Sequence, residues 1–85
     1  MNRILVTTYL SKDKRIASVM AAEYEMTNSW RNQGIIEHLF ARENSGGGVV
    51  VFNGTDLEKV KQLMSELPLA PYFERVEYML LEKVY

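Results

Sequence analysis

Hydrophobic positions change their spacing several times along this chain, and each change predicts a new element. Segment 4–10 is rich in β-branched and aromatic residues and is followed by a charged cluster, which predicts a first strand. From Ile16 to Trp30 the apolar residues fall on one side of a 3.6-residue helix, and Gly34 stands where helices commonly end. Segment 35–41 is short and apolar and leads into a polar, glycine-rich turn, so it predicts a second strand.

The second half of the chain shows the same change from strand to helix. Segment 48–53 predicts a strand that forms a hairpin with segment 35–41. Thr55 and Glu58 have the spacing of a capping box, which predicts that Thr55 caps the next helix. A helical apolar stripe follows and ends at the two prolines; its members are Leu57, Val60, Met64 and Leu67, before Pro68 and Pro71.

A last strand over 75–81, with Val76, Tyr78 and Leu80 on one face, completes the order βαββαβ. This order predicts a ferredoxin-like α+β fold: a four-stranded antiparallel sheet with both helices on one face. We find no linker or internal repeat, so residues 1–85 are expected to form a single domain. A chain of this length buries only ~60% of its unfolded surface, which makes oligomerisation a plausible source of stability.

The predicted strands carry apolar residues on both faces, which is typical of a sheet that is covered on both sides. Two helices cover only one of these faces. Because monomers rarely expose large apolar patches, we expect a second copy of the chain to cover the other face, giving a dimeric α/β-barrel. The residues concerned are Ile4 with Val6, Leu5 with Tyr9, Val49 with Val51, Val50 with Phe52, and Leu80 beside Leu81.

Composition excludes several classes of function. The net charge is −1, which argues against general binding to nucleic acids or anionic membranes. The predicted strand 48–53 resembles the third strand of RNA-recognition domains, but its valines offer no surface on which bases stack. There is no cysteine and only one histidine, so we expect no thiol chemistry and no protein-only zinc site. With no secretory signal and no apolar run near ~20 residues, a cytoplasmic location is expected.

Glu23 is the most informative single residue. Steps of ~100° per residue place it near the centre of the apolar stripe of the first helix, facing the sheet. Burial would raise the pKa of its carboxyl group, which suits a residue that takes up and returns a proton near neutral pH. The alternative is a structural role, in which the carboxylate pairs with a nearby hydroxyl or reaches the edge of the helix.

The other candidates are one histidine and several tyrosines. His38 is predicted to share a strand face with Ile36 and Phe40, inside an apolar layer, where it is either a catalytic group that meets Glu23 or a hydrogen-bonded core residue. Four tyrosines offer hydroxyls on apolar bodies, which suit a small polar ligand but are equally ordinary in cores. They are Tyr9, Tyr24, Tyr72 and Tyr78, and we take the first three as the candidate substrate-binding residues.

The segment Leu67-Pro68-Leu69-Ala70-Pro71-Tyr72 resembles a motif of the muconolactone delta-isomerase family, which typically reads Leu-Pro-Leu-Phe-Pro-Tyr. The resemblance spans roughly residues 21–72, with further matches at Glu23, Glu25, Gly34, His38, Leu39, Phe52, Glu58 and Leu67. The chain departs from the family at Ala70, and at Met20 and Tyr24, where the isomerases tend to have lysines.

The resemblance implies a dimer, with a higher oligomer as a further expectation, and a cofactor-free isomerase. Such an enzyme moves a double bond in a small unsaturated lactone by proton transfer. Glu23 and His38 are the positions that would carry this chemistry. Two alternatives stay open: a non-catalytic module that binds a small ligand or assembles on the same fold, and a monooxygenase like those of related dimeric barrels.

Overall fold

Four strands and two α-helices follow one another in the order βαββαβ in this computed structural model, which describes residues 2–85. The predicted ferredoxin-like fold is therefore confirmed. The strands are β1 (Asn2–Leu10), β2 (Ile36–Ala41), β3 (Gly48–Asn53) and β4 (Phe73–Glu82), the helices are α1 (Ile16–Asn32) and α2 (Leu57–Ser65), and two short 3-10 turns are η1 (Glu43–Ser45) and η2 (Ala70–Tyr72).

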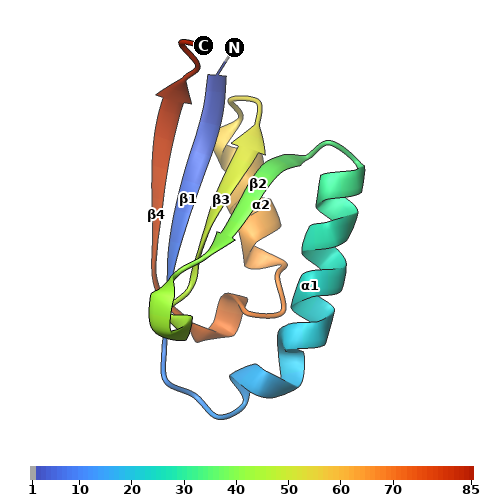
Figure 1. The fold of residues 1–85 in the computed structure, drawn as a ribbon, viewed down its shortest axis with the longest axis vertical. Helices are drawn as coiled ribbons and strands as arrows, with labels where there is room; N and C mark the ends of the chain where they lie inside the picture. The colour runs from blue at the N-terminus through green and yellow to red at the C-terminus, as the bar shows by residue number, and fades with distance from the viewer. Residues whose placement is uncertain (1) are drawn as a thin grey trace.

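The strands form one antiparallel sheet in the order β2-β3-β1-β4, with both helices on the same side of it (Figure 1). In the central pairs, Ile4 lies opposite Phe52 on β3 and opposite Leu80 on β4. Ile4, Val6 and Phe52 are the largest fully buried side chains, and they point towards the helices. The core therefore lies between the sheet and the two helices.

Local sequence explains where the helices begin and end. Helix α1 packs Trp30 against Phe52, with ring centroids 5.7 Å apart, and the chain turns at Gly34, whose φ of 76° suits glycine. Helix α2 is capped by Asp56, which accepts a hydrogen bond from the Lys59 N–H at 3.1 Å. The predicted cap at Thr55, with the Glu58 N–H as its donor, is thus wrong by one residue, because the Asp56 carboxylate takes the capping role one position later, at the Lys59 N–H.

The sheet face opposite the helices, here called the open face, carries apolar side chains on all four strands. Phe40 and Met79 are 57% and 58% exposed there. Its apolar members are Leu5, Phe40, Val49, Val51, Met79 and Leu81. The prediction of apolar residues on both faces therefore holds for the single chain.

A β-bulge in β2 changes which face His38 occupies. The pairing of β2 with β3 shifts between Ile36, opposite Phe52, and His38, opposite Val51. The extra residue reverses the alternation of side chains, so Ile36 is buried under the helices while His38 lies on the open face with Phe40. The prediction that His38 shares a face with Ile36 is therefore wrong.

No helix within residues 2–85 is long and apolar enough to cross a membrane.

Candidate functional site

Glu23 lies on the buried side of α1, as the helical stripe predicted. The residue is 8% exposed and is flanked one turn later by Thr27, whose hydroxyl donates to the Glu23 carbonyl at 3.0 Å. Its carboxylate oxygen Oε1 accepts a hydrogen bond from the backbone N–H of Leu69 at 3.0 Å. Burial raises the pKa of Glu23, and the Leu69 hydrogen bond opposes that rise in part.

The partner of Glu23 belongs to the segment between α2 and β4, here called the proline loop (residues 67–72). Leu67 and Leu69 anchor this loop in the interior, where they are 3% and 6% exposed. The N–H groups of Ala70 and Tyr72 bond to carbonyls of the loop itself, and the prolines have none to give. The Leu69 N–H is thus the loop donor left for Glu23, and this bond joins a buried carboxyl group of α1 to the loop.

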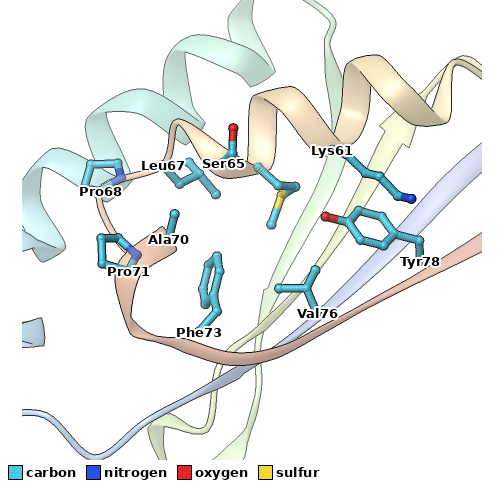
Figure 2. Close-up of a pocket in the computed structure, with 10 residues that line it drawn as sticks. Lys61, Ser65, Leu67, Pro68, Ala70, Pro71, Phe73, Val76 and Tyr78 are labelled. Carbon is cyan, nitrogen blue, oxygen red and sulfur yellow. The ribbon is translucent and has the colours of Figure 1, made fainter.

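A groove of about 600 Å³ runs between α2 and β4 on the helix side of the sheet (Figure 2). Its walls are mostly apolar: Met64 from α2, Leu67, Pro68, Ala70 and Pro71 from the proline loop, and Phe73 and Val76 from β4. Figure 2 shows Lys61 reaching from α2 towards the ring of Tyr78 at one end of the groove. Glu23 does not line this α2–β4 groove, since it reaches the proline loop from α1.

The structure does not bring His38 to Glu23. The side chain of His38 is 59% exposed on the open face, and its Nε2 lies 3.7 Å from Oε1 of Glu37. The other oxygen of Glu37 accepts from Arg3 at 3.1 Å, and this hydrogen bond is the largest cause of a lowered Glu37 pKa. The sheet therefore separates the two predicted catalytic groups within one chain.

The predicted substrate-binding tyrosines lie in three different places. Tyr9 is on the open face, where its hydroxyl donates to Glu77 at 2.7 Å; this bond raises the pKa of Tyr9 and lowers that of Glu77. Tyr24 is 57% exposed on α1. Tyr72 is the last residue of the proline loop, with the guanidinium of Arg15 at 5.5 Å from its ring centroid. The three hydroxyls do not form one binding site in the single chain.

Sequence reasoning missed two features of this region. The Leu69 N–H carries no side-chain signal, so only the packing of the proline loop against α1 shows it. The second is Lys61, whose spacing from Met64 places it beside the apolar stripe of α2. Within residues 2–85, no three His, Cys, Asp or Glu side chains are grouped so as to hold a metal ion.

The fold of this chain is shared with solved structures at low sequence identity. A 5-chloro-2-hydroxyhydroquinone dehydrochlorinase from Burkholderia phenoliruptrix, in complex with 2,5-dihydroxybenzoquinone, has a TM-score of 0.68 at 14% identity, covering 91% of this chain and 90% of that one. An antibiotic biosynthesis monooxygenase has a TM-score of 0.66 at 14% identity over the full length of both chains. A hypothetical protein from Pyrococcus horikoshii has a TM-score of 0.55 at 12% identity, covering 98% and 92%.

These similarities establish the fold alone, because the identities are low. No curated protein matches the chain. A comparison with models of protein families gives a longer match, which extends from β1 to the end of β4. The model of the muconolactone delta-isomerase family matches residues 5–82, and the chain belongs to this family.

Proposed function

We propose that this protein is a cofactor-free isomerase that shifts a C=C bond within a small unsaturated lactone, with Glu23 as the group that carries the proton. The observation on which this rests is the buried Glu23 carboxylate with its raised pKa, in a chain of the muconolactone delta-isomerase family. A carboxyl group whose pKa is raised towards neutrality is both a better base and an acid that re-forms easily.

The reaction needs no net change in protons or electrons. The Glu23 carboxylate would remove a proton from one ring carbon, and the electron pair of that C–H bond would move into the conjugated lactone as a dienolate. The Glu23 carboxylic acid would then return the proton at another carbon, leaving the double bond in its new position. The Leu69 N–H supports this role because it fixes one oxygen of the carboxylate and leaves the other for the proton.

The test is turnover of muconolactone, followed by ultraviolet absorbance, in the native protein and in Glu23→Gln. General acid–base groups typically contribute ~10²- to 10⁴-fold, so we expect a loss of that size. The matched control is Glu25→Gln, because Glu25 is an exposed carboxylate on the same helix. Equal rates in both variants, with native circular dichroism, would remove Glu23 from the mechanism, and absence of turnover in the native protein would reject the substrate.

A second candidate function is a non-catalytic module that binds a small ligand. This candidate is favoured by the position of Glu23, which is bonded to the proline loop and does not line the α2–β4 groove. In that case Glu23→Gln changes the stability of the fold and leaves ligand binding unchanged. Binding measured without turnover would support this reading over the isomerase.

We further propose that a second copy of the chain covers the open face. The apolar residues there are accompanied by two ion pairs within the chain, Arg3 with Glu37 and Arg75 with Glu77, so burial would leave none of these four charges without a partner. His38 lies on this face beside Glu37, so we assign it to the interface rather than to the Glu23 site. The expectation of a still larger assembly, and of a cytoplasmic location, stays a prediction for native mass measurement and cell fractionation.

Light scattering on the purified protein tests the dimer. We expect twice the chain mass of 9.8 kDa for the native protein. Val51→Glu, at the centre of the open face, should give the monomer mass, whereas Val84→Glu, at an 82% exposed position, should not. A native protein of 9.8 kDa at micromolar concentration would refute the dimer.

A further inference from the structure

Strand β4 forms one edge of the sheet, and no strand within residues 2–85 pairs with its outer side. The order β2-β3-β1-β4 makes β2 and β4 the two edges, and Figure 1 shows β4 as the outermost strand at its end of the sheet. An edge strand presents a row of unpaired N–H and C=O groups that another strand can extend. A bulge interrupts β2, whereas β4 pairs with β1 without a shift over residues 75–82. The more regular of the two edges is therefore that of β4.

The second half of β4 lacks the features that usually protect an edge, which are charged residues, prolines and bulges. Segment 78–81 reads Tyr-Met-Leu-Leu and contains none of them. Large apolar side chains are exposed here on both faces of the strand. Leu80, opposite Ile4 on the helix side, is 64% exposed, and Met79, on the open face, is 58% exposed. An uncharged edge with exposed apolar side chains indicates a place where a further strand adds to the sheet.

A second copy of β4 matches this edge when the two strands run antiparallel about a two-fold axis at Leu80. Side chains that lie opposite one another in adjacent strands share a face, so the axis of such a pair passes through one residue. The opposite pairs, from the axis outwards, are Leu80 with Leu80, Met79 with Leu81, Tyr78 with Glu82, Glu77 with Lys83, and Val76 with Val84. Apolar residues thus face apolar residues, and Glu77 faces a lysine on each side of the axis.

Charge disfavours the neighbouring registers. Moving the axis by one residue towards the N-terminus places Arg75 opposite Lys83, and like charges in this position are destabilising. Moving it by one residue the other way places Met79 opposite Lys83 and Leu80 opposite Glu82. Of these three registers, the one centred at Leu80 alone pairs opposite charges.

The acid of that pair is accessible to the second copy. Glu77 accepts from Tyr9 at 2.7 Å and pairs with Arg75, yet its side chain is still 43% exposed. A carboxylate has two oxygens and accepts more than two hydrogen bonds, so a lysine ammonium from the other copy can join these partners. Lys83 is exposed as well.

We propose that β4 is a self-association edge, at which two copies of the chain join β4 to β4 in the antiparallel register centred at Leu80 and form one continuous sheet. The two-fold axis is perpendicular to the sheet, so the helices of both copies lie on the same side of it. The open face is left uncovered by this contact, which is therefore separate from the dimer proposed above and links two such dimers. The contact uses neither Glu23 nor proton transfer, so it does not depend on the isomerase.

Sedimentation equilibrium of the native protein tests this edge by mass. A contact along single strands is smaller than a standard interface of ~1,600 Å², so we expect weak association, with a mass at ~1 mM at least twice that at ~10 µM. Leu80→Lys puts two ammonium groups opposite each other and should abolish the increase. Leu39→Lys, the same change at a 41% exposed position of the other edge strand, should keep it. No increase for the native protein, or equal behaviour of the two variants, would overturn the proposal.

The register is tested by disulfide formation, since the chain has no cysteine of its own. Leu80→Cys faces itself across the axis, at ~4.5–5.5 Å between Cβ atoms, and should form a covalent dimer on mild oxidation at ~1 mM. Val84→Cys is the control: position 84 is 82% exposed, but in this register it lies opposite Val76 and far from its own copy. Linking at position 84 that is as fast as at position 80 would show that accessibility alone decides, and would reject the register.

Charge reversal tests the pair at the ends of the contact. Lys83→Glu places a glutamate opposite Glu77 twice per contact, which should weaken association by ~5- to 30-fold. Adding Glu77→Lys to this variant reverses both charges and should restore association to within about threefold of the native protein. An unchanged affinity in Lys83→Glu would overturn the proposed register, as would a double variant no better than the single one. None of these measurements uses turnover, so their failure leaves the proposed isomerase untouched.

Discussion

Leu67 holds the proline loop in place, and its truncation measures how strongly. The side chain is 3% exposed, packs in the core and forms part of the groove wall. Leu67→Ala removes three carbon groups, which at about 0.8 kcal/mol each is a transfer loss of about 2.4 kcal/mol. The cavity left behind brings the cost to about 3 kcal/mol or more.

The matched control is Leu80→Ala, the same truncation on the neighbouring strand. Leu80 is 64% exposed, so only about a third of the transfer term applies, or roughly 0.8 kcal/mol. A domain of this length has a total stability of about 4–13 kcal/mol, so both variants should remain folded at 25 °C. The melting temperature of Leu67→Ala should fall by about 12–24 °C.

Urea unfolding followed by far-ultraviolet circular dichroism gives both free energies by linear extrapolation. Each variant is measured at two protein concentrations, because association would make the stability depend on concentration. A cost below about 1 kcal/mol for Leu67→Ala, or equal costs for the two leucines, would refute the packing of the proline loop described above. The position of the Leu69 donor beside Glu23 would then also be in doubt.

Two further predictions concern a charge and a helix cap. Burial makes the folded-state pKa of Glu23 higher than its pKa in the unfolded chain, so the native protein loses stability as the pH rises through that folded pKa. The free energy of unfolding of Glu23→Gln should therefore increase relative to that of the native protein between about pH 4 and pH 8. A difference between the two proteins that does not change with pH would contradict this. Asp56→Ala should cost about 1 kcal/mol in thermal unfolding, whereas Thr55→Ala should stay within about 0.5, and the reverse order would restore Thr55 as the cap.

The order of elements could be predicted because each one follows from local spacing. The burial of Glu23 could be predicted for the same reason, since a helical stripe fixes which side of α1 a residue occupies. His38 shows where this reasoning fails: its face depends on a bulge set by the pairing of β2 with β3, and alternation within β2 alone predicts the opposite side. A bulge adds one residue without a mark in the local pattern of hydrophobicity.

The site is harder to predict than the fold because its contacts join distant parts of the chain. Glu23 and Leu69 lie 46 residues apart, and the donor is a backbone group that every residue except proline possesses. Lys61 and Tyr78 approach one another because α2 crosses β4, which no short motif encodes. The chemistry of the tyrosine hydroxyl carries no information on position, so the dispersal of Tyr9, Tyr24 and Tyr72 over the molecule does not follow from the sequence.

The hydrogen bond from Leu69 to Glu23 also gives the protein an internal reporter. The chemical shift of an amide proton depends on the charge of the oxygen that accepts it, so the Leu69 resonance should follow the ionisation of this single carboxyl group. Its titration would therefore measure the basicity of Glu23 with no substrate present. It would also do so in variants that have lost all turnover, where kinetics are silent.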